Sequence, residues 1–212
     1  MSSLDALARL RRLGVPVIET ADAAAALRQS PSAASRTLAR LAKAELVAPV
    51  RHGVWSLEPN PNPYHLVEHL TAPLPSYLSL QTALHLRGLI EQIPAIIYVV
   101  SLARTQRVQT TAGTFSIHHV APAIFVGFER SADGLPLATA EKALFDLAYL
   151  SGGRSRSFAA VPELELPRGF RWNELASFTD RITSARHRAL VKRRLRQFVA
   201  SERRGPIPRW LR

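Results

Sequence analysis

The 212-residue chain contains no cysteine, and this absence removes two kinds of structure from consideration. Disulfide bridges cannot form, and zinc sites built on cysteine thiolates are excluded. Proteins without disulfides suit a reducing compartment, so we expect a cytoplasmic protein.

Long apolar runs are also missing. The longest candidate, residues 96–102, is far shorter than the ~20 residues that cross a bilayer. Residues 1–14 hold no long apolar stretch ahead of a cleavage site, so we expect no secretory signal. Because 47% of the residues are hydrophobic, the chain can still build a core of one or two domains. We therefore expect a folded protein with no membrane partner.

Acidic residues are scarce, with 16 Asp and Glu against 28 Lys and Arg, and the net charge is +12. Residues 181–212 carry 11 Lys and Arg against one acid, and residues 1–58 carry 8 against 5. The middle, 59–180, is nearly neutral with 9 against 10. Such polarised charge favours a polyanionic partner, nucleic acid or a membrane surface, over a merely soluble basic protein. The helix pattern described next favours nucleic acid.

The first 58 residues predict a winged helix-turn-helix. Gly14 ends a first apolar-periodic segment, Thr20 is a candidate N-cap for a second, and Ser30 or Ser32 caps a third. A glycine supplies the turn of a hairpin whose tip is 51–53. The expected elements are helices over about 3–13, 23–27 and 32–44, then a two-stranded hairpin over 46–57.

The third expected helix has two chemically different faces. Ala34, Leu38 and Leu41 cluster on one side, and four polar or basic residues fall within an arc of roughly 80° on the other. Any solvated amphipathic helix has such a face, but the helix–helix–hairpin order favours insertion into a major groove. A plain polar turn is an equal alternative at the hairpin tip. The candidate DNA-binding residues are Ser32, Ser35, Arg36, Thr37, Arg40 and Lys43 on the helix, with Arg51 and His52 at the tip.

A Pro/Asn spacer at 59–63 predicts a semi-rigid linker between residues 1–58 and a second domain, 64–212. The second domain alternates apolar strands with capped helices, so we expect an α+β protein whose winged helix precedes a mixed α/β domain with a small sheet packed by helices. The expected helices are 64–70, 78–87, 139–150, 173–178 and 184–200, and the expected strands are 96–102, 107–111, 114–120 and 123–128.

The last expected helix carries much of the charge. Val191, Leu195, Phe198 and Val199 form an apolar stripe, and basic residues point away from it. A solvated basic face is one interpretation, but like charges this dense repel one another, which favours contact with phosphates. The candidate residues are Arg186, Arg193, Arg194 and Arg196.

Several segments together resemble the AbiEi family of antitoxins from type IV toxin–antitoxin systems. These are Gly53-Val-Trp55, residues 77–89, 93–94, 97–100, 115–119 and 127–128, and Leu137-Ala-Thr-Ala-Glu-Lys-Ala-Leu-Phe-Asp-Leu147. The resemblance covers about residues 1–200, and 138–147 is its most specific piece. It implies a winged helix with an antitoxin domain, binding to inverted repeats in the cell's own promoter, autorepression, and antagonism of a nucleotidyltransferase toxin of the AbiEii kind. The high density of arginine after Arg186 is unusual for this family.

Catalytic motifs are weak. His65-Leu-Val-Glu68-His69 fits a short zinc-protease pattern but lacks a third ligand, and His118-His119 on one strand would point to opposite faces. Asp133, Glu141 and Lys142 could suggest a nuclease, but Glu141 falls in the first turn of a helix, where it favours the dipole. We therefore expect no catalytic residue, no metal and no cofactor. The alternatives are a ligand-responsive winged-helix regulator and a metal-dependent nuclease or peptidase.

Overall fold

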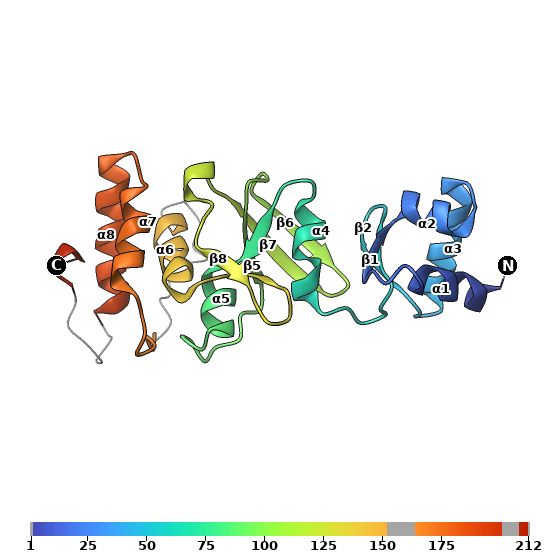
Figure 1. Ribbon diagram of the computed structural model, residues 1–212, viewed down its shortest axis with the longest axis horizontal. Coiled ribbons are helices and arrows are strands. Elements are labelled where there is room, and N and C mark those ends of the chain that lie inside the picture. The colour runs from blue at the N-terminus through green and yellow to red at the C-terminus, as the bar shows by residue number, and fades with distance from the viewer. Residues whose placement is uncertain (1, 152–163, 201–207, 212) are drawn as a thin grey trace. The chain divides into compact units, whose positions relative to one another are not determined.

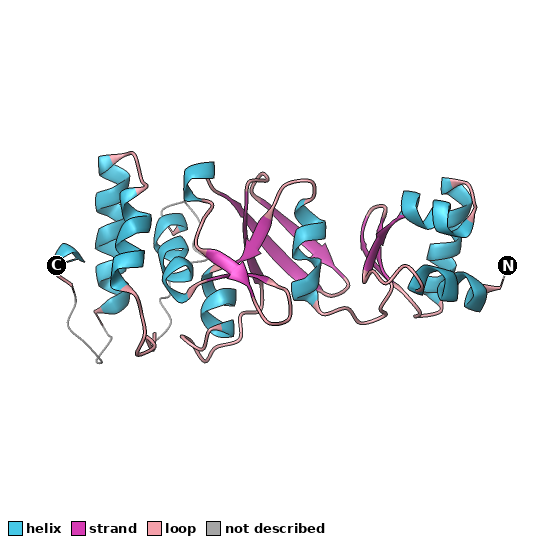
Figure 2. Ribbon diagram, in the orientation of Figure 1, coloured by secondary structure: helices cyan, strands magenta, loops and turns pink. Residues whose placement is uncertain are grey.

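The computed structural model describes residues 2–151, 164–200 and 208–211. It is an α+β protein in which the described residues form eight α-helices and two sheets (Figures 1 and 2). The chain divides into two compact units, Met1–Pro73 with Val108–Thr114, and Leu74–Arg107 with Phe115–Arg212. Residues 59–73 thus group with the first unit, whereas the domain limits at 58 and 64 stay a prediction. None of the described helices is both long and apolar enough to pass through a membrane.

The first unit places three helices against a three-stranded antiparallel sheet of order β1-β3-β2. Its local signals are strong: Ser2 and Asp5 form a reciprocal cap, and Ser30 caps the third helix with Pro31 in its first turn. The elements are α1 (Ser3–Arg11), β1 (Val17–Glu19), α2 (Thr20–Leu27), α3 (Pro31–Lys43), β2 (Ala48–Arg51), β3 (Val54–Ser56), the 3₁₀ helix η1 (Pro63–Leu66) and α4 (Val67–Thr71).

One aliphatic core joins α1, α2 and α3 of the first unit. Leu10 of α1, Leu27 of α2 and Leu41 of α3 are buried in the same cluster, and Trp55 of β3 packs against it. The structure differs from expectation at the start of α2, where Glu19 is the N-cap residue and makes no side-chain cap. Thr20 lies inside the helix, and its hydroxyl bonds elsewhere in the unit.

The second sheet is six-stranded and mixed, of order β6-β7-β5-β4-β9-β8. Residues 108–114 of β6, β7 and their turn group with the first unit, and the rest of the sheet belongs to the second. β5 lies inside this order, parallel to β7 and antiparallel to β4, as its continuous apolar run predicts. The strands are β4 (Ser76–Leu78), β5 (Ile97–Ser101), β6 (Gln106–Thr110), β7 (Gly113–His119), β8 (Phe128–Arg130) and β9 (Pro136–Ala138). The helices are α5 (Leu80–Leu86), η2 (Pro122–Ile124), α6 (Ala140–Leu150), α7 (Trp172–Asp180), α8 (Ala185–Val199) and η4 (Arg209–Leu211).

Two expectations for the second unit are wrong. The segment 123–128 is not a strand: η2 ends at Ile124, and β8 begins only at Phe128. The helix expected from Leu78 begins at Leu80, because Leu78 belongs to β4 and pairs with β5 and β9. Strands β4, β8 and β9 have only three residues each, too few to show a period-2 pattern.

Helix α6 is the centre of the second unit. Thr139 caps it, and its residues from Glu141 to Ala148 are all buried. Helices α7 and α8 both pack against α6, and Figure 1 shows them in orange beside it. A helix buried on every side is a core element.

Candidate nucleic-acid interface

The outer face of α3 carries five of the six residues expected there. Four buried residues, Ala34, Thr37, Leu38 and Leu41, hold the opposite face against the unit. The helix therefore presents two hydroxyls and three cations to solvent without an acidic residue among them. The exposed candidates are Ser32, Ser35, Arg36, Arg40 and Lys43.

Thr37 does not share this outer face. It is only 4% exposed, and its hydroxyl donates to Gln29 Oε1 at 3.2 Å, just before α3 begins. The helical position explains this, because Thr37 falls about 40° from Leu41 on the wheel and far from Arg36. Its side chain is therefore committed to holding the α2–α3 turn.

The other two candidates of the first unit lie at the turn between β2 and β3. Arg51 and His52 are both exposed, and Gly53 follows them with φ +77°. A side chain at Gly53 would meet no atom within 4 Å, so the backbone conformation alone favours glycine there. Thr20 and Trp55, which the sequence did not mark as site residues, bond to each other through their side chains beside this turn at 3.0 Å.

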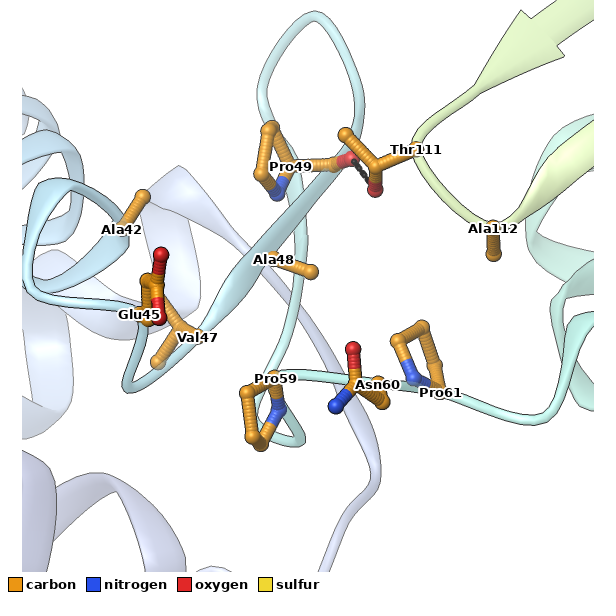
Figure 3. Close-up of a pocket in the computed structure, with 10 residues that line it drawn as sticks. All are labelled: Ala42, Glu45, Val47, Ala48, Pro49, Pro59, Asn60, Pro61, Thr111 and Ala112. Carbon is orange, nitrogen blue, oxygen red and sulfur yellow. Dashed lines mark hydrogen bonds between the residues drawn. The ribbon is translucent and has the colours of Figure 1, made fainter.

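A groove of about 650 Å³ also belongs to the first unit (Figure 3). Small residues and three prolines form most of its wall, and Glu45 supplies the single charge among the lining residues. Thr111 Oγ1 donates to Pro49 O at 3.1 Å along one side, as the dashed line in Figure 3 shows. Its lining residues are Ala42, Glu45, Val47, Ala48, Pro49, Pro59, Asn60, Pro61, Thr111 and Ala112.

In the second unit, the basic candidates divide into two kinds. Arg186, Arg193 and Arg196 are exposed on α8, opposite its buried apolar stripe. Arg194 is only partly exposed, and its Nη1 donates to Ala148 O of α6 at 3.3 Å. Burial, with the neighbouring charge of Arg193, lowers the pKa of Arg194. Three of the four arginines therefore remain directed to solvent, and the fourth ties α8 to α6.

Helix α6 and the segment from β4 to the start of α5 form a buried polar network. Asp146 Oδ2 accepts from Tyr77 Oη at 3.0 Å and from Ser79 Oγ at 2.7 Å. Its Oδ1 accepts from Lys142 Nζ at 2.6 Å, and Lys142 Nζ also donates to Ile124 O at 2.9 Å. Neither Lys142 nor Asp146 has any exposed side-chain surface. Burial lowers the pKa of Lys142 and raises that of Asp146, while their mutual attraction opposes both shifts.

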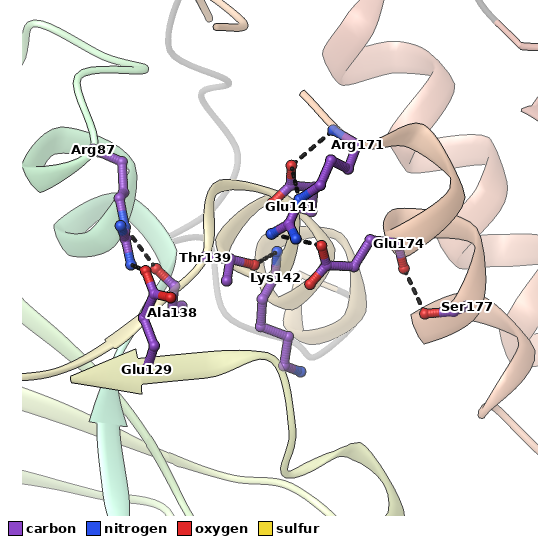
Figure 4. A network of polar contacts seen from close by, with 9 residues as sticks. All are labelled: Arg87, Glu129, Ala138, Thr139, Glu141, Lys142, Arg171, Glu174 and Ser177. Atoms are coloured by element: carbon purple, nitrogen blue, oxygen red, sulfur yellow. Dashed lines mark hydrogen bonds and ion pairs between the residues drawn. The ribbon is translucent and has the colours of Figure 1, made fainter. Parts of the chain in front are cut away.

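The carboxylate considered for a nuclease site is also enclosed. Glu141 Oε1 accepts from the backbone N–H of Arg171 at 2.7 Å, and the Arg171 guanidinium bridges it to Glu174. Figure 4 shows the Lys142 side chain running away from this cluster, so Glu141 and Lys142 do not form one site. Burial raises the pKa of Glu174, with the charge of Glu141 adding to the shift. These carboxylates therefore bind arginine and backbone.

Histidine positions give no metal site in the described part of the chain. No group of three or more His, Cys, Asp or Glu side chains gathers there closely enough to hold an ion. His118 lies against Ser116, with 2.9 Å between its Nε2 and the Ser116 hydroxyl, and stacks on Tyr98. Burial lowers the pKa of His118, which favours the neutral ring.

Comparison with known proteins does not identify a family. No protein-family model matches the chain, and a search of curated proteins gives no significant match.

Proposed function

We propose that this chain is a DNA-binding transcriptional autorepressor and antitoxin that has no catalytic activity. In this proposal the first unit is a winged helix-turn-helix, α3 is its reading helix, and the β2–β3 turn is the tip of its wing. The antitoxin role, against a nucleotidyltransferase toxin, rests on the sequence resemblance to the AbiEi family. The binding target is double-stranded DNA, with inverted repeats in the chain's own promoter as the expected operator.

The observation that carries the proposal is the outer face of α3. Arg36, Arg40 and Lys43 are exposed on the side opposite the core, so their positive charges are free to meet an anionic surface. A guanidinium can make two hydrogen bonds to a guanine edge, and serine or lysine can bond bases or phosphates. The capped start of α3 at Ser30 and its packing through Leu38 and Leu41 fix the helix rigidly enough to present these groups in register.

The α8 arginines support a second, sequence-independent contact. Arg186, Arg193 and Arg196 present three cations without an acidic neighbour on α8. Phosphate oxygens suit such a surface, because neutralising them releases condensed counterions. In this proposal α3 supplies specificity and α8 supplies affinity that depends on salt.

The test separates DNA reading from toxin neutralisation in the full-length chain. Arg36→Ala with Arg40→Ala should weaken binding to the promoter duplex by about 1–3 kcal/mol for each arginine that bonds a base edge in two-pronged fashion, with little change on scrambled duplex. The matched control is Arg104→Ala, which removes an exposed arginine from the second unit. In cells, the α3 variant should lose repression of its promoter and still neutralise the toxin. Wild-type affinity in the α3 variant would show that α3 is not the reading helix.

The groove in Figure 3 favours a second candidate function, a ligand-responsive regulator. Its volume suits a small molecule, and Glu45 would pair with a cationic group on such a ligand. A screen of small amines by thermal shift tests this candidate. Stabilisation that is lost in Glu45→Gln, together with altered affinity for the promoter duplex, would support it over a ligand-independent repressor.

A further inference from the structure

The turn between β2 and β3 projects beyond the last pair of the β1–β3 ladder, Glu19 with Val54. β3 has only three residues, and the pairing of β2 with β3 shifts register between Pro49 and Arg51. Such an irregularity interrupts the ladder of backbone hydrogen bonds at the point where the chain enters the turn. A short, irregular hairpin with an exposed tip needs support from outside if its side chains are to keep one position.

That support comes from the first residue of α2. The backbone N–H of Thr20 donates to Gly53 O at 2.8 Å, and the Thr20 hydroxyl donates to the same oxygen at 3.2 Å. Because the first backbone N–H groups of a helix have no partner within the helix, the Gly53 carbonyl also satisfies one of these donors. The turn is therefore attached to the start of α2 by a carbonyl that lies two residues after Arg51.

A second side chain fixes the orientation of the Thr20 hydroxyl. Trp55 Nε1 donates to Thr20 Oγ1 at 3.0 Å, so the hydroxyl oxygen accepts from the indole while its proton points to Gly53 O. Trp55 is itself held, because it pairs with Ile18 in the β1–β3 register and packs against the core of the unit. The chain of bonds runs from a core-anchored indole, through one hydroxyl, to the carbonyl of the turn.

We propose that Thr20 and Trp55 are positioning residues that hold the β2–β3 turn, and with it Arg51, in a fixed place relative to the reading helix α3. This inference rests on the proposed DNA-binding function. α2 and α3 share one core through Leu27, Leu38 and Leu41, so a turn attached to the start of α2 is attached to the body that carries α3. The Thr20 hydroxyl makes no helix cap, so its hydrogen bonds serve the turn.

The test uses the full-length chain and a duplex enriched from random sequence by repeated binding to the wild type. Thr20→Val keeps the branched shape and the backbone bond to Gly53 but removes the hydroxyl. We expect it to weaken duplex binding by about 5- to 10-fold and to flatten the dependence of log affinity on log salt by about one unit, as expected when one phosphate is no longer neutralised. Thr20→Ser, which keeps the hydroxyl, should restore wild-type affinity.

Double variants separate positioning from a general loss of structure. Because Thr20 acts through Arg51, Thr20→Val should cause no further loss in an Arg51→Ala background. The fold-losses in affinity from Thr20→Val and Arg40→Ala should multiply, since the position of α3 does not depend on the Thr20 hydroxyl. The inference would be overturned if Thr20→Val caused the same fold-loss in affinity in the Arg51→Ala and Arg40→Ala backgrounds. Wild-type affinity of Thr20→Val alone would also overturn it.

A readout without DNA distinguishes failure of the inference from failure of the proposed function. Hydrogen exchange of the amides at 51–54 should be faster in Thr20→Val than in wild type, and unchanged in Thr20→Ser and Arg40→Ala. If Thr20→Val does not fold, Trp55→Phe takes its place, because it removes the indole donor and leaves a smaller aromatic ring against the core. An unchanged exchange rate at the turn would refute the proposal that Thr20 and Trp55 hold it in place. Faster exchange in Thr20→Val, in a protein whose wild type binds no duplex, would refute DNA binding but support the positioning role of Thr20.

Discussion

The buried pair Lys142–Asp146 makes the stability of the second unit depend on a single carboxylate. Asp146→Asn, which replaces one carboxylate oxygen by an amide nitrogen, tests this dependence. The aspartate accepts three hydrogen bonds, from Tyr77, Ser79 and Lys142, and has no exposed side-chain surface. An asparagine of the same shape places an amide group, which can only donate, where one of these donors now bonds. It also leaves the Lys142 ammonium buried with no negative charge beside it.

The expected loss follows from the burial of both groups. Removing one partner of a buried ion pair costs about 3–5 kcal/mol, because the remaining charge is left without compensation. Ile124 O and the nearby Phe145 ring, 4.6 Å from Lys142 Nζ, keep some stabilisation for the ammonium. We therefore expect about 3 kcal/mol, at the lower end of this range. The double variant Lys142→Met/Asp146→Asn should lose less than the sum of the two single variants, since it leaves no charge behind.

The assay is hydrogen exchange in increasing urea, because it reports peptides of the second unit separately from those of the first. With a denaturant dependence of about 1–3 kcal/mol per molar urea, the loss lowers the unfolding midpoint of peptides from α6 by at least about 1 M. Asp133→Asn, an exposed residue of the second unit, is the charge-matched control and should change nothing. A loss below about 1 kcal/mol for Asp146→Asn would refute the argument that this carboxylate compensates a buried ammonium.

Three further predictions concern α8, a close backbone approach and pH. Gly127→Ala should destabilise the second unit by about 1–3 kcal/mol, because the added Cβ would lie 2.5 Å from Cζ of Phe178. Gly134 has a similar positive φ, but a Cβ there would meet no atom within 4 Å. Comparing the urea unfolding of the two alanine variants therefore separates the steric clash from backbone strain. Burial lowers the pKa of His118, so its imidazole binds a proton more tightly in the unfolded chain than in the folded one. The free energy of unfolding should therefore fall as pH drops below the ordinary pKa of 6.5. Urea titrations at about pH 7.5 and about pH 5.5 should show a smaller loss of stability for His118→Gln than for the wild type, and an equal loss would show that His118 is not its cause. Replacing three α8 arginines by Gln should flatten the salt dependence of duplex affinity by about two to three units with specificity unchanged, whereas Arg104→Gln should not alter it, and an unchanged slope would direct these side chains to an acidic protein surface instead. The three α8 residues are Arg186, Arg193 and Arg196.

Local signals in the sequence determined most of the helices. Ser30 before Pro31, Thr139 and Ser184 each cap the helix that their sequence predicts, because a hydroxyl and the third backbone N–H after it lie within one turn. Apolar periodicity likewise predicted the buried faces of α3 and α8. These features depend on residues a few positions apart, so no knowledge of the rest of the chain is needed.

Short strands and the roles of individual polar residues required the tertiary structure. Strand β9 has three residues and pairs with β4, which lies nearly sixty residues earlier, so its own sequence holds no sign of the partnership. The helical wheel gave the outward face of α3 and already places Thr37 on the side of Leu41, but only the packed unit showed Gln29 as its hydrogen-bond partner. In the same way, Arg194 looks like its neighbours in sequence and differs because Ala148 O lies within its reach.

The Lys142–Asp146 network shows the physical reason for this division. The i, i+4 spacing of the pair is visible in the sequence and is typical of an exposed helix surface, where such a pair contributes little. Tyr77 of β4 and Ser79 at the start of α5 lie more than sixty residues away in the chain. Their hydroxyls enclose the pair, and burial makes its loss costly. Backbone hydrogen bonds within a helix are local and can be predicted from the sequence, whereas burial and the partners of a side chain are set by segments that meet only when the chain has folded.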